Sequence, residues 1–531
     1  ESLQEVRQAL QLTDKQLMQD KIEVPAYRML YLDEALQENA MMEVIRDVSF
    51  ASRIEKLQNP DFEKDYVPDS LKGILREYQK TGAAWIGTLY SNRFGGILAD
   101  DMGLGKTLQV ISFLLTEHTG CSLIVCPASL VYNWKHELER FAPSLKADMV
   151  TGNVQQRKEV LDRWKEVDVL ITSYDLLRRD ITDYQELHFF CEVIDEAQYI
   201  KNHGTQAARA VKQVQTGFRL ALTGTPIENR LSELWSIFDY LMPGYLYSYQ
   251  RFRTELEQPI VQHKDEDAAK RLQRLIRPFV LRRLKKEVLQ DLPDKLEENL
   301  YADMDGEQQE LYDAHVRRMK LMLEEKSDEE IRTDKIEILA ELTRLRQLCC
   351  DPALLYDNYK GGSAKTELVR GLIRSAVENG HKVLLFSQFT TMLERLYRVL
   401  EEEKIASHML TGATPKEKRI EMVGSFAHDE VPVFCISLKA GGTGLNLTAA
   451  DVVIHFDPWW NSAVQNQATD RAHRIGQKNV VNVYRILAKG TIEEKIVELQ
   501  ERKLQLSDRI LGGESLQAQG LTREELLELL R

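Results

Sequence analysis

The chain has 531 residues, of which 43% are hydrophobic and 29% are charged, and its formal net charge is −13 at pH 7. This composition is ordinary for a globular protein with two or three domains, and no run approaches the ~18 uncharged apolar residues of a membrane span. The acidic charge excludes a protein that coats nucleic acid indiscriminately, so a nucleic-acid partner would require a locally basic track.

Residues 1–68 are expected to form an N-terminal helical segment, and they contain no chemical motif. Their first residues, ESLQEVRQAL, are charged and do not resemble a signal peptide. Because the chain does not begin with Met, we expect it to be part of a longer protein. The six cysteines include no CxxC pair and no cluster with zinc-ligand spacing, which favours a reducing compartment.

Residues 69–290 are predicted to form a first α/β lobe, since short apolar runs alternate with helix-like segments. The runs occupy 95–100, 121–127, 168–174, 189–195 and 218–224. Continuous apolar strands separated by helices indicate a parallel sheet that is covered on both faces. The last part of this lobe, 227–290, has helical character throughout and predicts a helical insertion.

The same alternation returns in a second lobe at 363–515, with apolar runs at 382–389, 407–412, 431–438, 451–457 and 480–487. Residues 291–362 between the lobes predict a linker and a helical protrusion. A capping box at 522–525 predicts a C-terminal helix over 516–531. The expected fold class is therefore α/β, with two parallel-sheet lobes and helical protrusions.

The stretch DDMGLGKT at 100–107 follows a predicted strand and enters a predicted helix. Gly103 and Gly105 allow close approach of the backbone to phosphate oxygens, Lys106 would reach the β- and γ-phosphates, and Thr107 would place its hydroxyl on Mg²⁺. The common GxxxxGK[ST] string has Gly where this chain has Asp100. A glycine-rich turn with an incidental lysine is the alternative.

Asp195 and Glu196 end another apolar run, at the edge where open α/β sheets bind ligands. Asp195 would hold Mg²⁺ through water, and Glu196 would orient and deprotonate an attacking water. Taken alone, an Asp-Glu pair after a strand could equally be a helix N-cap.

Two arginines, Arg471 and Arg474, stand in the stretch QNQATDRAHRIGQ among glutamines and small residues. On a helix this spacing would place both guanidinium groups on one face. Asp470, four positions before Arg474, is the one acidic residue in this stretch, so a single carboxylate stands beside two guanidinium groups and we expect the pair to meet a charge outside this segment. A solvated helix face is the alternative.

Taken together, these motifs resemble the SWI/SNF-type ATPases of the helicase superfamily, whose fold has two RecA-like lobes. The resemblance covers about residues 70–515 and rests on LREYQ, DDMGLGKT, DEAQ, LTGTPIEN, SLKAGGTGLNL and QATDRAHRIGQ in this order. In that family Asp replaces the missing glycine of the loop. The resemblance implies that Arg471 and Arg474 are arginine fingers, carried by the second lobe toward the γ-phosphate of ATP on the first.

The resemblance also implies that ATP and Mg²⁺ are the cofactors. Catalytic roles fall to Lys106, Asp195, Glu196, Arg471 and Arg474, and metal contacts to Thr107 and Asp195. The implied ATP contacts are Arg76, Gln79, Asp101, Met102, Gly103, Leu104, Gly105, Lys106, Thr107, Leu108, Gln198, Gly442 and Gly444. Gln198 stands where many relatives have His.

Double-stranded DNA is the implied partner, lying across both lobes. The matching positions are Pro127, Ser129, Trp134, Thr172, Ser173, Lys201, Asn202, Thr223, Thr225, Arg282, Arg283, Ser387, Gln388, Lys439, Gly441, Thr443 and Trp460. Hydroxyl, amide and backbone N–H groups suit phosphates without reading base sequence. Packing is the alternative role for Trp460, and a solvated helix face is the alternative for the basic run that contains Arg282 and Arg283.

The implied function is that of an ATP-dependent translocase on duplex DNA, or a remodeller of protein–DNA complexes, which does not separate strands. Two alternatives remain open: a helicase stimulated by RNA or single strands, and a nucleotide-sensing DNA scaffold without turnover. We expect a monomer that acts on an unidentified DNA-bound protein. Its expected location is the bacterial cytoplasm or nucleoid, or the nucleus in a eukaryote.

Overall fold

The structure is a computed structural model that describes residues 66–224, 231–289, 292–326, 334–441, 445–460 and 462–500, together with Met29, Asp47, Val48 and Phe50. The predicted segments 1–68 and 516–531 therefore lie almost wholly outside the described residues. The chain divides into two compact units between Val288 and Leu289, two residues before the predicted boundary at 290.

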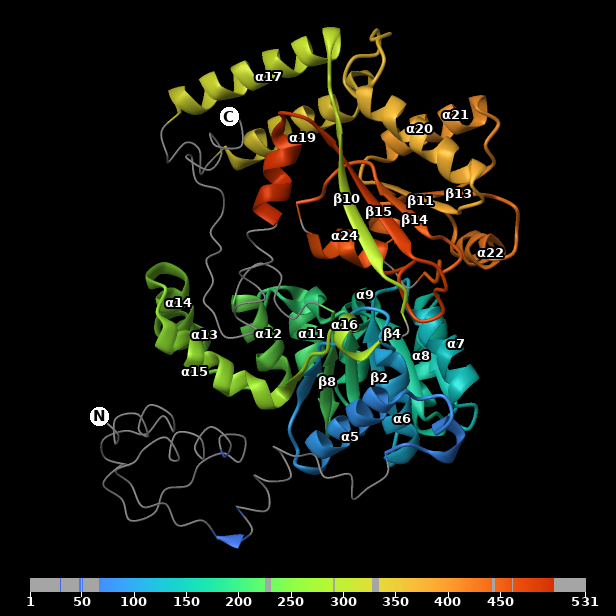
Figure 1. Cartoon of the computed structure of the whole chain (residues 1–531). Helices are drawn as coiled ribbons and strands as arrows, with labels where there is room; N and C mark the ends of the chain where they lie inside the picture. The colour runs from blue at the N-terminus through green and yellow to red at the C-terminus, as the bar shows by residue number, and fades with distance from the viewer. Residues whose placement is uncertain are drawn as a thin grey trace. The chain divides into compact units, whose positions relative to one another are not determined.

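The first unit is built on a seven-stranded parallel sheet with the strand order β3-β4-β2-β6-β8-β1-β9 (Figure 1). Its strands are β1 (Gly96–Leu98), β2 (Ser122–Cys126), β3 (Ala147–Met149), β4 (Val169–Ser173), β6 (Glu192–Asp195), β8 (Arg219–Leu222) and β9 (Val280–Leu281). The central strands β2 and β4 are buried along their whole length. Burial on both faces explains why they appear in the sequence as continuous apolar runs.

Helices cover both faces of this sheet. On one face α5 (Glu77–Ser91), α6 (Lys106–Thr116) and α7 (Val131–Phe141) pack side by side, and on the other α9 (Tyr174–Arg179) and α12 (Leu231–Leu241) flank α11 (Gln206–Gln213). Farther along the chain, α13 (Tyr249–Phe252), α14 (Gln258–His263) and α15 (Glu266–Ile276) form a helical protrusion (Figure 1). The first lobe is thus confirmed as a parallel α/β lobe with a helical insertion.

The second unit is built on a six-stranded parallel sheet with the order β10-β15-β14-β11-β13-β12. Its strands are β10 (Lys295–Ala302), β11 (Val383–Ser387), β12 (Ser407–Leu410), β13 (Val433–Ser437), β14 (Val452–His455) and β15 (Val481–Ala488). Along β11, Val383 and Leu385 pack with α20 (Ala364–Glu378) and α21 (Thr390–Glu402). Leu384 and Phe386 point to the other face, toward α22 (Lys416–Phe426) and α24 (Ser462–Thr469).

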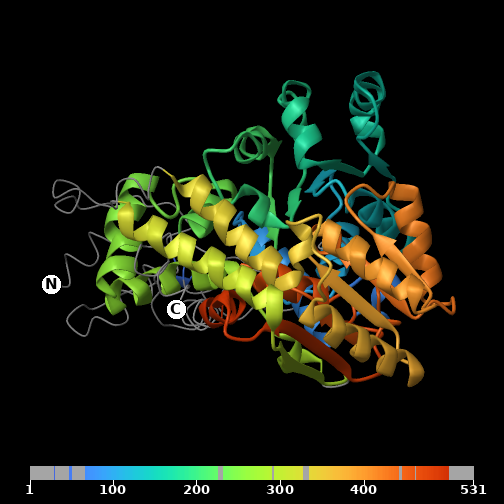
Figure 2. The same cartoon turned by 90° about the horizontal axis from the view of Figure 1, so that it is seen from above.

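A helical hairpin, α17 (Gly306–Glu325) and α19 (Lys335–Cys350), belongs to this unit, and its two helices lie side by side (Figure 2). It packs with residues of the helical stretch 492–500 in a cluster separate from the two cores on the sheet. The second lobe and its helical protrusion are therefore present as predicted.

Three strands of the two large sheets were missed by the sequence prediction. The segment predicted as helical to 290 contains β9, which pairs with β1 at the sheet edge, and the predicted linker contains β10, which pairs with β15 along eight residues. The strand β3 is a further edge strand. Edge strands are half exposed, as the residues of β10 are, so they lack the continuous apolar run that identified the central strands.

Candidate functional site

The predicted nucleotide-binding motifs meet at one edge of the first sheet. The phosphate loop, residues 100–107, follows β1, the acidic pair ends β6, and Thr223 follows β8. Because β8 lies between β6 and β1 and all three are parallel, their carboxyl ends are adjacent. This edge is where open α/β sheets bind ligands.

The backbone of the phosphate loop requires glycine at two positions. Gly103 and Gly105 have φ angles of 87° and 75°, and Gly105 is the N-cap of α6. A Cβ on Gly105 would lie 2.4 Å from Nε2 of Gln79, so a larger residue there would displace that side chain and strain the backbone. The loop therefore delivers backbone N–H groups to a helix N-terminus, which is an arrangement suited to phosphate.

Lys106 lies within the loop that it is expected to serve. Its Nζ donates a hydrogen bond of 2.6 Å to the carbonyl oxygen of Asp100. Its charge also lowers the pKa of Asp195, so the lysine and the acidic pair share one electrostatic environment. The structure thus brings together Lys106 and Asp195, two of the five predicted catalytic residues, within the first unit.

Asp195 is held from two sides. Its Oδ2 accepts a 2.9 Å hydrogen bond from Nε1 of Trp134, and its Oδ1 accepts one of 2.8 Å from the backbone N–H of Glu196. Burial, with the neighbouring Glu196 carboxylate, raises the pKa of Asp195 to about 6, against the opposing effects of Trp134 and Lys106. A magnesium ion at this carboxylate would favour its ionised form further.

Glu196 begins a short 3-10 helix with its backbone in the left-handed region, at φ 53°. A non-glycine residue in this conformation is characteristic of functional sites. Its Oε2 accepts a 2.7 Å hydrogen bond from Nε2 of Gln198, whose Oε1 accepts one of 3.1 Å from the Thr223 hydroxyl. This chain of contacts joins the end of β6 to the end of β8. The turn after β8 also lies close to the phosphate loop, since a Cβ on Gly224 would lie 3.9 Å from the backbone nitrogen of Met102.

Gln79 supports the phosphate loop from α5. Its Nε2 donates to the Leu104 carbonyl at 3.0 Å, and its Oε1 accepts from the backbone N–H of Arg76 at 2.9 Å. Both ends of the amide are therefore engaged with the backbone in this state. A role in recognising adenine stays a prediction for Gln79 and Arg76.

The residues present fit a magnesium ion. Thr107 and Asp195 offer a hydroxyl and a carboxylate, the hard oxygen donors that Mg²⁺ prefers. No group of three or more His, Cys, Asp or Glu residues that could hold a metal occurs within the described residues.

Arg471 and Arg474 follow α24 but are not helical. The helix ends at Thr469, and turns occupy 470–476. Gln477 explains this ending, because its Nε2 donates to the carbonyls of Thr448, Ala450 and Ala472 and so fixes a turned backbone. The prediction of two arginines on one helical face was wrong. We call residues 470–477 the finger loop; Arg471 is buried and Arg474 half-buried in it.

The residues predicted to contact nucleic acid differ in how far they are exposed to solvent. Ser129, Lys201, Asn202, Arg282, Gln388 and Trp460 are at least partly exposed. Six others, Pro127, Trp134, Thr172, Ser173, Thr223 and Ser387, are buried. These six side chains support their loops, as when the Ser387 hydroxyl donates to Asp457, and contact with DNA stays a prediction for them. Thr225, Gly442, Thr443, Gly444 and the side chain of Lys439 lie outside the described residues, and Gly441 is the last residue of α23 (Leu438–Gly441).

Arg283 is another residue that was predicted to contact DNA. It forms an ion pair with the fully buried Asp100, with Nη2 2.5 Å from Oδ2. Its guanidinium is engaged inside the first unit, and we do not retain it as a DNA contact. Two further partners of the site were missed from the sequence: Trp134 on Asp195, and Tyr174, whose hydroxyl donates to the Asp195 carbonyl at 2.7 Å. No spacing in the sequence connects residues so far apart.

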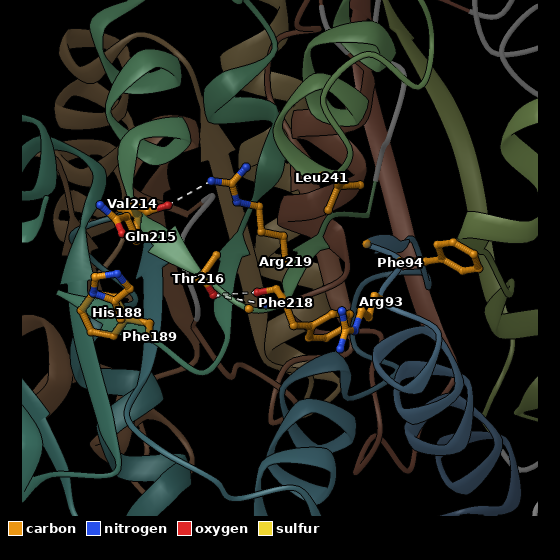
Figure 3. Close-up of a pocket in the computed structure, with 12 residues that line it drawn as sticks. Arg93, Phe94, His188, Phe189, Val214, Gln215, Thr216, Phe218, Arg219 and Leu241 are labelled. Carbon is orange, nitrogen blue, oxygen red and sulfur yellow. Dashed lines mark hydrogen bonds between the residues drawn. The ribbon is translucent and has the colours of Figure 1, made fainter. Parts of the chain in front are cut away.

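A pocket of about 560 Å³ opens at the opposite edge of the same sheet, where β1 and β8 begin (Figure 3). Arg219 lines it, but its guanidinium donates to the carbonyls of Tyr240, Lys212 and Val214. Figure 3 draws two hydrogen bonds between residues that line the pocket. One joins the Arg219 guanidinium to the Val214 carbonyl, and the other joins the Thr216 hydroxyl to the Phe218 carbonyl. None of the residues predicted to bind nucleotide lines this pocket, so it is separate from the predicted nucleotide site.

Among the described residues, no helix has both the length and the apolar character needed to cross a membrane.

Comparison with known protein families agrees with this geometry. Residues 78–354 match the SNF2-related domain, residues 364–476 match the helicase conserved C-terminal domain, and residues 1–68 match the model described as bacterial SNF2 helicase associated.

Several curated proteins are similar in sequence. The chain is 41% identical over 464 residues to an uncharacterized ATP-dependent helicase, MG018, of Mycoplasma genitalium, covering 86% of the chain and 44% of that protein. It is 40% identical over 479 residues to the putative ATP-dependent helicase/translocase YwqA of Bacillus subtilis, covering 87% and 51%. It is 34% identical over 554 residues to the TATA-binding protein-associated factor mot1 of Schizosaccharomyces pombe, covering 90% and 28%. The chain thus spans about half or less of the length of each of these relatives.

Among solved structures, the Sulfolobus solfataricus SWI2/SNF2 ATPase core in complex with dsDNA is 37% identical, covering 83% of this chain and 93% of that one, with a TM-score of 0.42. The match to the SNF2-related domain alone extends over more than half of the chain. This chain therefore belongs to the SNF2-related family of helicase-like ATPases.

Proposed function

We propose that the chain is the motor part of an ATP-dependent translocase on double-stranded DNA, which remodels protein–DNA complexes without separating strands. The observation that carries this proposal is the meeting of the phosphate loop, the Asp195–Glu196 pair and the Thr223 turn at one sheet edge. The names of the relatives, which include helicase and translocase, support ATP as the energy source.

Different residues would carry out different parts of ATP hydrolysis. Backbone N–H groups of the phosphate loop and Lys106 bind the phosphates, and Thr107 and Asp195 would hold Mg²⁺, which would neutralise charge on the phosphate oxygens when bound. Glu196 orients the attacking water and accepts its proton. Arg471 and Arg474 act as arginine fingers, which stabilise transition-state charge and are worth ~10³–10⁵ in rate where such residues have been measured.

Duplex DNA is the proposed partner because a solved relative is described in complex with dsDNA. The partly exposed residues Ser129, Lys201, Asn202, Arg282, Gln388 and Trp460 are the contacts we retain. Most of these are polar groups that contact phosphate without reading bases, so binding should depend on salt rather than on DNA sequence.

The decisive experiment measures phosphate release with duplex DNA, single-stranded DNA and RNA at two salt concentrations. We expect the strongest stimulation by duplex DNA, a weaker effect at high salt, and loss of turnover in Glu196→Gln with ATP binding retained. Turnover that duplex DNA does not stimulate, together with an unchanged rate in Glu196→Gln, would contradict the proposal.

The word helicase in the relatives' names makes strand separation the second candidate function. A strand-displacement assay separates the two. Displacement of a labelled strand during ATP turnover would favour an unwinding helicase, whereas displacement of a bound protein from intact duplex supports the translocase. A chain that binds ATP and DNA but releases no phosphate would instead be a nucleotide-sensing scaffold.

A further inference from the structure

Two loops of the second unit leave its sheet at the same edge. Residues 387–389 stand at the end of β11, and residues 457–460 follow β14. The two strands are parallel neighbours, with Phe386 opposite His455. Gln388 and Trp460, two of the DNA contacts that we retain, therefore lie in adjacent loops at the carboxyl ends of adjacent strands. We call residues 387–389 and 457–460 the contact loops.

Asp457 joins the contact loops to each other. Its side chain is completely buried, and its Oδ1 accepts a 2.6 Å hydrogen bond from the Ser387 hydroxyl and one of 3.2 Å from the backbone N–H of Gln388. Burial raises the pKa of Asp457, against the opposing effects of Arg346 and Lys365. The link between the loops thus contains a buried carboxylate that needs a cation nearby to stay ionised.

Arg346 brings such a cation from α19, the second helix of the helical hairpin. Only 3% of this residue is exposed. Its Nη2 lies 3.8 Å from Asp457 Oδ2 and donates to the carbonyl of Pro458. Its guanidinium carbon lies 5.6 Å from the ring centroid of Phe389 and 5.8 Å from that of Trp460. One side chain of the hairpin therefore contacts both contact loops.

The shape of the guanidinium group suits this position. A planar guanidinium donates hydrogen bonds at its edge while its faces lie against aromatic rings. An ammonium group is a compact, strongly hydrated charge, so a lysine at this position would keep the charge and lose this combination of contacts. Two residues earlier on the same helix, Arg344 pairs with Glu341 of that helix, and its side chain is 47% exposed. Arg344 thus provides a comparison for Arg346.

Each contact loop presents a group that suits a nucleic-acid backbone. Among the residues that the structure describes, Nε2 of Gln388 has no hydrogen-bond acceptor, so this amide keeps a donor for a phosphate oxygen. Trp460 packs in part against the hydrophobic cluster of the hairpin and stays partly exposed, so it keeps an aromatic surface for a ligand. The contact loops determine where these two groups lie relative to each other.

We propose that Arg346 is a positioning residue for DNA binding, which fixes the two contact loops to each other and to the helical hairpin and thereby places Gln388 and Trp460 together against a duplex backbone. This inference rests on the proposed function, since it takes duplex DNA as the partner. A contact group loses much of its contribution when its supporting residues let it move by about 1 Å. The alternative is that Arg346 only neutralises Asp457, in which case a folded variant would bind DNA normally.

Arg346→Lys tests the proposal, because it keeps the charge and loses the planar group. Binding of a fluorescein-labelled duplex to the full chain is measured by fluorescence anisotropy at one low salt concentration. We expect binding about ten-fold weaker than in the wild type, which is the effect of losing about one hydrogen bond to a charged group. Arg344→Lys is the matched control and should bind as the wild type does. Equal affinity in folded Arg346→Lys and the wild type would overturn the inference.

A double-mutant cycle tests whether Arg346 acts through the two proposed contacts. In a chain that already carries Gln388→Ala and Trp460→Ala, Arg346→Lys should change duplex affinity less than about two-fold, because nothing remains for it to position. A further ten-fold loss in that background would show that Arg346 acts by another route and would overturn the inference.

Hydrogen–deuterium exchange provides a measurement that needs no variant. Duplex DNA should protect peptides that cover both contact loops of the wild type, and protection of only one loop would overturn the inference. Thermal melting checks the folding of each variant. Should Arg346→Lys not fold, Asp457→Asn removes the other charge of the pair and should weaken binding similarly.

Failure of the proposed function would look different from failure of this inference. A wild type that does not bind duplex DNA would contradict the proposed function and with it the role of Arg346. A wild type that binds duplex DNA, together with a folded Arg346→Lys of equal affinity, would contradict the role of Arg346 alone.

Discussion

The indole N–H of Trp134 on α7 donates a 2.9 Å hydrogen bond to the carboxylate of Asp195 at the end of β6. The two residues belong to different elements and are far apart in the chain. A tryptophan that is almost fully buried thereby sets the orientation of the carboxylate proposed to hold Mg²⁺. The sequence analysis lists Trp134 among the expected DNA contacts, whereas in the structure its indole N–H binds Asp195.

Replacing Trp134 with Phe should keep the buried ring and remove only the N–H donor. A hydrogen bond to a charged group is worth about 1.5 kcal/mol, so we expect ATP turnover at subsaturating Mg²⁺ to fall about ten-fold. Excess Mg²⁺ should restore part of this loss. A magnesium titration of turnover is the measurement, and Trp235→Phe, which removes an indole hydrogen bond to Tyr247 O instead, is the control. Equal magnesium dependence in the two variants would contradict the assignment.

A side chain on Gly82 of α5 would displace Gln109 and Arg283, the two residues that bind the Asp100 carboxylate. A Cβ at this position would lie 1.7 Å from Gln109 Oε1 and 2.8 Å from Arg283 Nη2. Helix propensity alone would make Gly82→Ala stabilising by up to about 1 kcal/mol. We expect the steric conflict to dominate and to weaken nucleotide affinity several-fold, as measured with a fluorescent ATP analogue.

Gly371 on α20 provides the matched control, because a Cβ there would have nothing within 4 Å. Gly371→Ala should raise the melting temperature and leave nucleotide affinity unchanged. Should Gly82→Ala bind nucleotide as tightly as Gly371→Ala, the packing around Arg283 would not control the loop.

Glu192 at the start of β6 makes the stability of the first unit depend on pH. Its carboxylate is fully buried, and although Arg219 Nε lies 3.5 Å away, burial outweighs this pairing and raises the pKa of Glu192 to about 8. The folded state thus holds a proton that the unfolded state releases near its ordinary value of 4.5. Stability from this group is fully present below the unfolded pKa and is lost as pH rises through the folded pKa.

Glu192→Gln should remove this dependence, because the amide stays neutral. We expect the melting temperature of the variant to rise relative to the wild type between pH 5 and pH 8. Thermal melts across that interval are the measurement. A difference between the two proteins that stays constant with pH would show that Glu192 is ionised throughout.

Lys365 and Glu493 form a completely buried ion pair in the second unit. Nζ lies 2.9 Å from both carboxylate oxygens, and Oε2 also accepts from Ala488 N at 2.8 Å. Lys365→Met should cost about 3–5 kcal/mol, because it leaves a buried carboxylate without a counter-charge.

The double variant Lys365→Met with Glu493→Gln should recover much of that loss, since no net charge then remains in the interior. Denaturant unfolding of the full chain measures both. A double variant no more stable than Lys365→Met would indicate that the pair acts through packing rather than charge.

The central strands, the phosphate loop, the acidic pair and the order of the motifs could all be predicted from the amino-acid sequence. Each of these is local: a buried strand is a continuous apolar run, and a loop that approaches phosphate needs glycine at Gly103 and Gly105. Edge strands such as β9 and β10 escaped prediction because half-exposed residues carry no such run.

The partner of each buried side chain became known only from the folded chain. The pairing of Arg283 with Asp100, the bond from Trp134 to Asp195 and the turned backbone at Arg471 depend on residues far apart in the chain. The sequence of a motif does not reveal whether a basic or aromatic side chain faces solvent or a buried carboxylate. The folded chain supplies this information, because a buried charge must find a partner.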